Sequence, residues 1–203
     1  MGKVVYLMGK SSSGKDTIYK KLLEDSVFRF QTVVLYTTRP IRIGEQEGIE
    51  YHFTDEAGFQ KLKKENKVIE DRTYDTVQGK WRYFTVLDPQ QIRLDSHNYL
   101  MIGTLESYQK TKACLGTENM IPVLIELDDG ERLQRALTRE KSQETPQYTE
   151  MCRRFLADET DFSEEKIREA GIDRRFQNNR LSDCLREIRQ YLKQNIETGK
   201  KAD

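Results

Sequence analysis

A phosphate-binding loop motif near the N-terminus is the feature that most constrains the fold of this chain. Residues 9–17 read GKSSSGKDT and directly follow the apolar run VVYLM. In the pattern G-x-x-x-x-G-K, the glycines let the backbone curl so that several N–H groups point at one phosphate, and the helix that follows adds positive potential. The motif therefore predicts a strand, a loop and a helix that together bind a nucleoside triphosphate.

The candidate triphosphate-binding residues lie in this loop. Lys15 is expected to reach the β- and γ-phosphate oxygens, while the loop supplies backbone N–H groups. The predicted set is Gly9, Ser11, Ser12, Ser13, Gly14, Lys15, Asp16 and Thr17. The alternative is a chance Gly/Ser turn before a helix, which the combination of strand, spacing and lysine disfavours.

Asp16 departs from the motif, because it stands where a hydroxyl group should meet the metal, and Thr17 follows one position later. An acidic residue in the first turn of a helix stabilises the helix dipole, which is one explanation. The other is that the carboxylate orders Mg²⁺, which prefers oxygen ligands and keeps several waters. Both explanations stay open, and Mg²⁺ bound with ATP is the expected cofactor.

The rest of the chain reads as an α/β protein. Apolar, β-rich runs at residues 3–8, 32–36, 98–102 and 121–127 predict buried strands. Helical patterns occupy residues 16–25, 105–115, 130–140 and 181–194. Alternating strands and helices predict a mostly parallel sheet that is covered on both faces, and 203 residues suit one domain of ordinary size.

Two stretches interrupt this alternation. Residues 37–88 are punctuated by glycine, with a helical pattern at 55–66 and strand patterns at 68–75 and 80–86, and they predict an inserted subdomain. Residues 139–154 are polar, contain Pro146 and carry arginines at both ends, which predicts a mobile flap. The last residues, 195–203, read as a frayed tail.

Composition limits the partners. Lys plus Arg and Asp plus Glu both number 34, so no global field favours nucleic acid or a membrane, and an anionic ligand requires local Arg and Lys clusters. No stretch approaches the roughly 20 apolar residues of a membrane span, and the N-terminal run is too short for a signal peptide, so a cytoplasmic protein is expected. Cys114, Cys152 and Cys184 lack a C-x-x-C pair and are predicted to be plain thiols.

The segment TTRPIRIGEQEGIEYHF, residues 37–53, resembles the signature T-T-R-x-x-R-x-G-E-x-x-G-x-x-Y-x-F of guanylate kinases. Guanidinium groups bind a phosphate dianion in bidentate fashion, and a phenol adds a directed hydrogen bond. A solvated charged turn is the alternative, but this residue order is specific. The matching positions are Thr38, Arg39, Arg42, Gly44, Glu45, Gly48, Tyr51 and Phe53.

This resemblance implies an α/β fold of the P-loop nucleoside monophosphate kinase type, with a parallel core sheet flanked by helices. The implied core comprises residues 1–36, 86–136 and 156–195, with a monophosphate-binding insert at 37–85, a lid at 137–155 and a frayed tail at 196–203. It also implies transfer of the γ-phosphate from ATP to a nucleoside monophosphate, foremost GMP or dGMP.

The resemblance also assigns roles to residues outside the loop. In the insert it places Glu70 and Thr85 at the guanine base and Tyr83 at the acceptor phosphate. The implied acceptor-binding set is Arg39, Arg42, Glu45, Tyr51, Glu70, Tyr83 and Thr85. The implied catalytic set, which surrounds the migrating phosphoryl group with positive charge, is Lys15, Arg39, Arg135, Arg139 and Arg154. Asn178 is implied to lie beside the adenine of ATP.

Three departures from the family pattern leave the acceptor open. Leu35 stands where the family has a serine that contacts guanine, and Met101 and Gly103 stand where it has two aspartates; a one-residue shift would place Thr104 there instead. Glu106 is then a rival to Asp16 at the metal. The alternatives are the same kinase machinery acting on another nucleotide or a ribose bisphosphate-type sugar phosphate, or a non-catalytic binding module. The intact Gly14–Lys15 pair disfavours the module.

Overall fold

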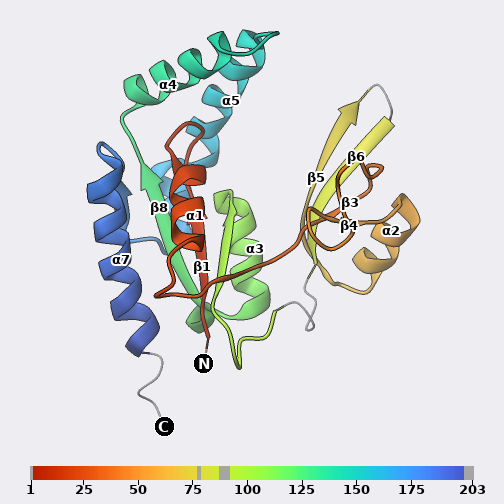
Figure 1. Cartoon of the computed structure of the whole chain (residues 1–203), viewed down its shortest axis with the longest axis horizontal. Helices are drawn as coiled ribbons and strands as arrows, with labels where there is room; N and C mark the ends of the chain where they lie inside the picture. The colour runs from red at the N-terminus through yellow and green to blue at the C-terminus, as the bar shows by residue number, and fades with distance from the viewer. Residues whose placement is uncertain (1, 77–78, 87–91, 199–203) are drawn as a thin grey trace.

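A sheet of five parallel strands forms the centre of the molecule (Figure 1). The structure is a computed structural model and describes residues 2–76, 79–86 and 92–198. The strand order is β2-β7-β1-β8-β9, and the bounds are β1 (Val4–Met8), β2 (Gln31–Thr32), β7 (Tyr99–Gly103), β8 (Met120–Glu126) and β9 (Arg175–Gln177). Because β1 pairs in parallel with both β7 and β8, its carboxyl end opens the phosphate-binding loop at the middle of the sheet edge.

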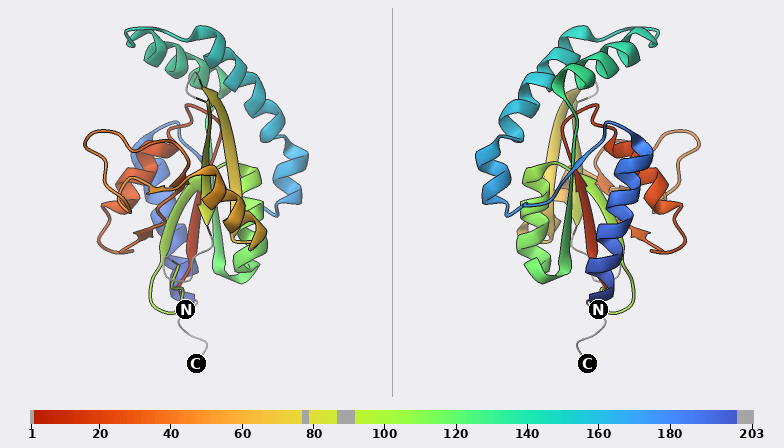
Figure 2. Two further views of the ribbon diagram at one scale, coloured as in Figure 1. Left: turned by 90° about the vertical axis from the view of Figure 1, so that its right-hand side faces the viewer. Right: turned by 90° about the vertical axis from the view of Figure 1, so that its left-hand side faces the viewer.

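Helices cover both faces of this sheet, as predicted (Figure 2). Val5 and Leu7 of β1 pack under α1 (Lys15–Leu23) and α7 (Leu181–Thr198). The alternate residues of β1, among them Tyr6, pack against α3 (Leu105–Leu115) and α6 (Glu164–Glu169) on the other face. A strand buried on both sides cannot alternate apolar with polar residues, which explains the continuous apolar run VVYLM.

The insert has a sheet and a small core of its own. Its strand order is β4-β3-β6-β5, with bounds β3 (Tyr36–Thr37), β4 (His52–Phe53), β5 (Val68–Thr76) and β6 (Gly79–Val86). The helix α2 (Glu56–Lys64) begins after Asp55, whose carboxylate accepts a hydrogen bond from the Gly58 N–H group. Phe59 of α2 packs on Phe84 and Val86 of β6. The helix and the two longer strands predicted in this region are confirmed.

Two helices lie over the carboxyl end of the sheet (Figure 1). They are α4 (Asp129–Lys141) and α5 (Tyr148–Asp161). Residues 139–154, predicted as a flap, are therefore helical at both ends, and only 142–147 connect the helices. The buried Glu140 carboxylate closes this connection by accepting a hydrogen bond from the Gln147 N–H group at 3.0 Å.

Two predicted elements differ in the structure. Residues 32–36 do not form one buried strand, because β2 ends at Thr32 in the core sheet and β3 begins at Tyr36 in the insert sheet. The apolar residues between them cross from one sheet to the other and are only half-buried. The tail is also shorter than predicted, since α7 extends to Thr198 and buries Ile196 against the core; residues 199–203 lie outside the described chain.

None of the helices in the described part of the chain combines the length and apolar character that a membrane span requires.

Candidate active site

The phosphate-binding loop joins β1 to α1 in the predicted strand-loop-helix arrangement. A Cβ atom on Gly9 would lie 2.4 Å from the carbonyl oxygen of Ile125, so the close approach of the loop to β8 requires glycine. Gly14 precedes α1 with φ at 89°, a left-handed conformation that favours glycine, and Lys15 is the first residue of the helix. The two glycines of the motif are thus explained by packing and by backbone geometry.

The serines and Asn178 form a buried polar lining beneath the loop. The hydroxyl oxygens of Ser12 and Ser13 are buried and have no hydrogen-bond partner among the described residues. Asn178 follows β9, and its side-chain amide donates to the carbonyl oxygen of Ser13 at 2.7 Å. Buried polar groups are normally paired, so unpaired hydroxyls in this loop fit a site that receives phosphate oxygens. The structure places Asn178 against the loop, and its contact with adenine stays a prediction.

A buried arginine connects the helices α4 and α5 to the phosphate-binding loop, and no sequence motif identified it. Arg132 of α4 is 1% exposed, and its Nε donates to the carbonyl oxygen of Ser11 at 3.0 Å. Its Nη2 donates to the Asp158 carboxylate of α5 at 2.8 Å, and Asp158 in turn accepts from the Ser11 N–H group at 2.7 Å. Asp129 and Glu159 complete the ion pairs. No sequence pattern distinguishes Arg132 from the exposed arginines of the same helix.

The predicted lid arginines lie on α4 and α5 and are exposed. Arg135 is the closest to the loop, where its Nη2 lies 3.5 Å from the carbonyl oxygen of Asn178. Arg154 pairs with Glu150 on α5 at 2.8 Å and lines a cavity of about 730 Å³ that Ser11 also lines. The described hydrogen bonds and ion pairs include none from the Arg139 side chain. Arg135 and Arg154 therefore face the loop region from different helices, and their roles stay predictions.

The two metal candidates are both exposed carboxylates. Asp16 is 80% exposed, and its Oδ2 lies 3.8 Å from the Lys15 ammonium. Glu106 lies in the first turn of α3 and pairs with Lys110 at 2.7 Å, and this ammonium group holds the pKa of Glu106 below its usual value. Residues 2–76, 79–86 and 92–198 contain no cluster of His, Cys, Asp and Glu that could hold a metal unaided. A Mg²⁺ ion here would depend on phosphate oxygens and waters for most of its ligands, as Mg²⁺ commonly does.

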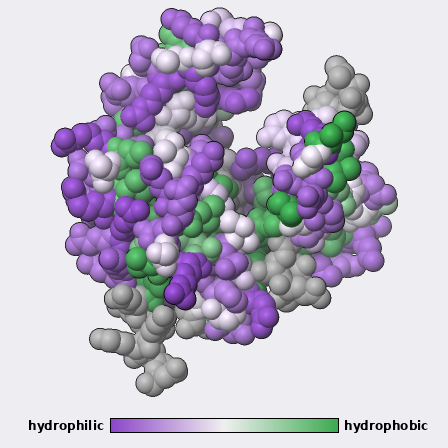
Figure 3. All heavy atoms as spheres, viewed as in Figure 1, coloured by the Kyte–Doolittle hydropathy of each residue, from purple (hydrophilic) through white to green (hydrophobic). Residues whose placement is uncertain are grey.

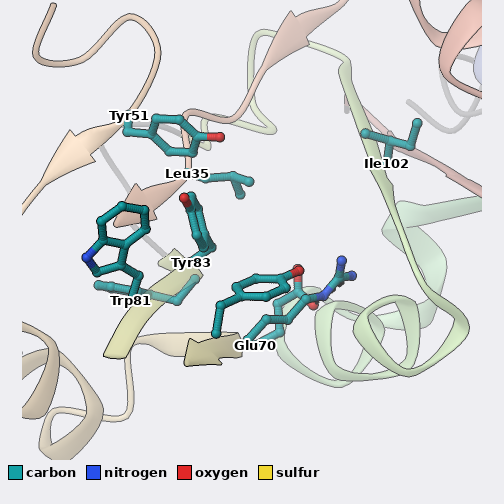
Figure 4. Close-up of a pocket in the computed structure, with 9 residues that line it drawn as sticks. Leu35, Tyr51, Glu70, Trp81, Tyr83 and Ile102 are labelled. Atoms are coloured by element: carbon teal, nitrogen blue, oxygen red, sulfur yellow. Dashed lines mark ion pairs between the residues drawn. The ribbon is translucent and has the colours of Figure 1, made fainter. Parts of the chain in front are cut away.

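A second cavity, of about 530 Å³, lies between the insert and β7 of the core (Figure 4). Figure 4 shows aromatic side chains of the insert, among them Tyr51, Trp81 and Tyr83, across the cavity from Ile102 of β7. In Figure 3 the molecule is hollowed between the core and the insert, and apolar side chains lie on both sides of the hollow. The cavity thus offers flat apolar walls to a planar ligand.

A bulge in β5 determines which polar side chains of this strand face the cavity. Val68 pairs with Val86, but Glu70 pairs with Thr85, so one extra residue, Ile69, is inserted into β5. Without this bulge, Glu70 would face α2. With it, Glu70 lines the cavity and lies on the same face of the sheet as the buried Thr85, whose hydroxyl donates to Glu70 Oε1 at 3.4 Å. The structure therefore brings together the two residues that the family resemblance assigned to the base.

The predicted phosphate-binding residues of the insert meet at one end of this cavity. Arg39 is 3% exposed, and its guanidinium group binds Glu45 through two hydrogen bonds of 2.8 and 2.5 Å. It also lies over the Tyr51 ring at 5.2 Å, and that ring contacts Tyr83. Arg42 is exposed, and its N–H group donates to Glu45 at 2.8 Å. Glu45 thus occupies the outer nitrogens of Arg39, and direct binding of phosphate by Arg39 stays a prediction.

The Arg39–Glu45 pair predicts a pH dependence of stability. Hydrogen bonds from Arg39 and from the Arg42 backbone lower the pKa of Glu45 from 4.5 to about 2. A depressed carboxylate pKa contributes stability that is complete above the unfolded pKa and is lost as pH falls toward the folded one. We therefore expect urea denaturation between pH 5 and about pH 2.5 to show a shallower loss of stability for Glu45→Gln than for the wild type. An equal loss of unfolding free energy per pH unit in Glu45→Gln and in the wild type would contradict this prediction. Glu144→Gln, on the exposed connection between α4 and α5, is the matched control.

The structure gives a physical reason for one departure from the family pattern. A Cβ atom on Gly103 would lie 2.4 Å from the Tyr6 hydroxyl and 2.5 Å from the Ser107 hydroxyl, so a side chain cannot fit there. These two hydroxyls hydrogen-bond to each other at 2.8 Å. Thr104 does not replace the missing carboxylate either, because its hydroxyl caps α3 by accepting from the Ser107 N–H group. Met101 is buried in the core, and Leu35 lines the cavity.

The central strand that opens a phosphate-binding loop, the inserted sheet with its aromatic cavity, and the helical pair over the loop define a class. They match the arrangement expected of a P-loop nucleoside monophosphate kinase fold, and the division of the chain into core, insert and lid stays a prediction.

Comparisons with known proteins indicate which nucleoside monophosphate kinases this chain is similar to. Residues 1–83 match the family model of guanylate kinase. A guanylate kinase of Schizosaccharomyces pombe is 44% identical over 68 residues, and one of Mycoplasma mobile is 42% identical over 69 residues. The crystal structure of guanylate kinase from Anaplasma phagocytophilum superimposes with a TM-score of 0.63 and 21% identity, covering 96% of this chain and 86% of that one.

Residues 1–83 are thus similar in sequence to guanylate kinases, and the whole chain is similar in fold to a guanylate kinase. The aligned segment spans 34% of the length of each curated relative. The match to the family model, over residues 1–83, includes the loop and most of the insert. The family model that matches is the one expected from the signature of residues 37–53, which lies within the matched segment.

Proposed function

We propose that this protein transfers the γ-phosphate of ATP to a nucleoside monophosphate, foremost GMP or dGMP. The observation that carries this proposal is the position of Glu70 in an aromatic cavity, next to the buried Thr85 hydroxyl. A carboxylate accepts hydrogen bonds from the N1–H and N2–H groups that guanine presents side by side, and aromatic walls stack on a planar base. The phosphate-binding loop then supplies the donor site.

The charges around the two cavities suit phosphoryl transfer. Lys15 and the loop N–H groups would hold the ATP phosphates, and Arg135, Arg139 and Arg154 would surround the migrating group. At the acceptor phosphate, Arg42 and the hydroxyls of Tyr51 and Tyr83 are available, with Arg39 held in place by Glu45. An acceptor phosphate is already anionic near neutral pH, so no general base is needed and the protein contributes mainly position and positive charge.

The residues of the loop fit a nucleotide-bound Mg²⁺, which would neutralise charge on the transferred phosphate. Asp16 is the proposed contact, because it lies on the first turn of α1 beside Lys15. We expect Asp16→Asn to raise the Mg²⁺ concentration needed for half-maximal activity by about tenfold, as loss of one charged contact does. A titration of activity with Mg²⁺ at saturating ATP measures this shift. An unchanged requirement would leave the helix dipole as the role of Asp16, and Glu106→Gln tests the rival.

A second candidate keeps the same machinery and changes the acceptor. It is favoured by Leu35 and Gly103, which offer no polar side chain at two positions where the family contacts guanine. A non-catalytic binding module is the third candidate, and the intact loop with its lysine disfavours it.

The deciding experiment measures ADP release from ATP and Mg²⁺ with GMP, dGMP, AMP, UMP, CMP, ribose 1,5-bisphosphate or no acceptor. Preference for GMP or dGMP is the expected result. Preference for another acceptor would support the second candidate. No turnover with any acceptor, together with measurable binding of ATP or GMP, would support the binding module.

A further inference from the structure

Arg72 lies in the same cavity and has no part in the scheme above. It stands two residues after Glu70 on β5, and alternate residues of a strand share one face, so both side chains line the cavity. Arg72 Nη2 lies 3.7 Å from Glu70 Oε2, while the Thr85 hydroxyl lies 3.4 Å from the other carboxylate oxygen, Oε1. A hydroxyl donor and a guanidinium donor therefore flank the two acceptor oxygens of Glu70.

These contacts leave the groups able to bind a ligand. Both distances exceed the usual 2.7–3.2 Å of a strong hydrogen bond to oxygen, as does the 3.5 Å from Arg72 Nη2 to the Thr104 hydroxyl. The Glu70 side chain is 16% exposed, so its oxygens are shielded from bulk water. Arg72 also lines the cavity that Ser11 and Arg154 line, and its guanidinium group thus stands where the two cavities adjoin.

The order of groups across the Glu70 carboxylate is donor, acceptor, acceptor, donor: the buried Thr85 hydroxyl, the two oxygens of Glu70, then Arg72. Glu70 and Arg72 line the cavity, and Thr85 lies buried behind Glu70. Guanine presents the complementary order along one edge, namely O6 as acceptor, N1–H and N2–H as donors, and N3 as acceptor. Adenine places an acceptor at N1, which would face the carboxylate. Uracil has no second donor, which would leave one carboxylate oxygen unpaired. The full array matches guanine alone among the common bases.

We propose that Arg72 is a specificity-determining residue that donates to N3 of the acceptor guanine. This inference rests on the proposed function, because it assumes a guanine nucleotide in this cavity. The proposal also gives a source of selectivity for guanine in a chain that has Leu35 and Gly103 at two expected base-contact positions. Tyr6 and Ser107 occupy the space that a side chain at position 103 would need. The additional contact with the base would come from Arg72 of the insert instead.

The test is equilibrium binding of GMP, 3-deaza-GMP, IMP and AMP, without ATP, to the wild type and to Arg72→Gln. Isothermal titration calorimetry measures affinity, and fluorescence of the single tryptophan, Trp81, which lines the cavity, gives an independent signal. In 3-deaza-GMP the N3 acceptor is a C–H group, and IMP lacks the 2-amino group that would contact Glu70. Lys64→Gln, which removes an exposed positive charge from the insert helix α2, is the matched control.

We expect the wild type to bind 3-deaza-GMP about tenfold more weakly than GMP, the usual effect of losing one charged hydrogen bond. Arg72→Gln should weaken GMP by a similar factor and leave 3-deaza-GMP unchanged, so the difference between the two ligands disappears. The loss of affinity for IMP should persist in Arg72→Gln, since Glu70 is intact, and Lys64→Gln should match the wild type.

Two results would overturn the role of Arg72 while leaving the proposed function intact. The first is a wild type that binds GMP and 3-deaza-GMP equally. The second is an Arg72→Gln variant that weakens both ligands by the same factor, which would mean that Arg72 acts through the charge of Glu70 or through its contact with Thr104. A wild type that binds GMP no better than AMP would instead overturn guanine as the acceptor base, whatever Arg72 does.

Discussion

Lys15→Met should lower kcat for ATP-dependent phosphoryl transfer by about 10²–10³-fold, the range seen when one preorganised donor to a developing charge is removed. Lys15 begins α1 after the phosphate-binding loop, and its side chain is 20% exposed. Its positive charge would lie where negative charge accumulates in the transition state, so its loss should affect kcat more than KM.

The measurement is steady-state kinetics with the best acceptor of the panel, with thermal unfolding as a check on folding. Lys20→Met is the matched control, because Lys20 is an exposed lysine of the same helix, one turn away from the loop. A kcat that falls less than about tenfold, with an unchanged Tm, would contradict the role of Lys15.

Arg132→Leu should lower the free energy of unfolding by about 3–5 kcal/mol, the usual effect of removing one partner of a buried ion pair. Arg132 is 1% exposed, and its removal leaves Asp158 without its buried cation and the Ser11 carbonyl without its donor. Because Asp158 also accepts a hydrogen bond from the Ser11 N–H group, the change should weaken the interaction between α5 and the phosphate-binding loop.

Urea denaturation followed by circular dichroism measures this loss, and hydrogen exchange at the Ser11 amide reports the loop directly. Adding Asp158→Asn to Arg132→Leu should restore part of the stability, since the uncompensated charge is removed along with its partner. Arg153→Leu, an exposed arginine of α5, is the control and should change stability by less than about 1 kcal/mol. A loss that small for Arg132→Leu would show that the buried network contributes little.

If the Arg132 network is as strong as expected, the upper helices and the loop form one unit. Arg132 of α4 and Asp158 of α5 both hydrogen-bond to the backbone of Ser11, so a movement of either helix would displace the loop backbone. The exposed arginines of these helices, Arg135, Arg139 and Arg154, would then be positioned relative to the loop by a buried residue that takes no part in the chemistry.

Local pattern was sufficient to predict the elements that carry the loop. The run VVYLM, the spacing of Gly9 and Gly14 and the amphipathic helix after Lys15 each depend on neighbouring residues, so β1, the loop and α1 form as predicted. The order of residues 37–53 similarly predicted the family model that residues 1–83 match, because the motif lies within one continuous segment.

Long-range packing determined what the patterns could not. Residues 32–36 read as one β-rich run, yet they divide between two sheets because their pairing partners, β7 and β6, lie far away in the chain. The bulge at Ile69 turns Glu70 toward the cavity, and only the register with β6 reveals it. Gly103 is glycine because Tyr6 and Ser107 fill the space beside it.

The sequence by itself therefore determined the fold class, the phosphate-binding loop and the family signature, since each is encoded by residues close together in the chain. Only the tertiary structure decided that Arg132 is buried beside the loop and that Thr85, Glu70 and Arg72 stand in one row. The physical reason is that burial and the pairing of hydrogen-bonding groups depend on contacts between distant segments of the chain. Ser11 and Arg132, for example, are more than a hundred residues apart. The spacing of neighbouring residues does not encode such contacts.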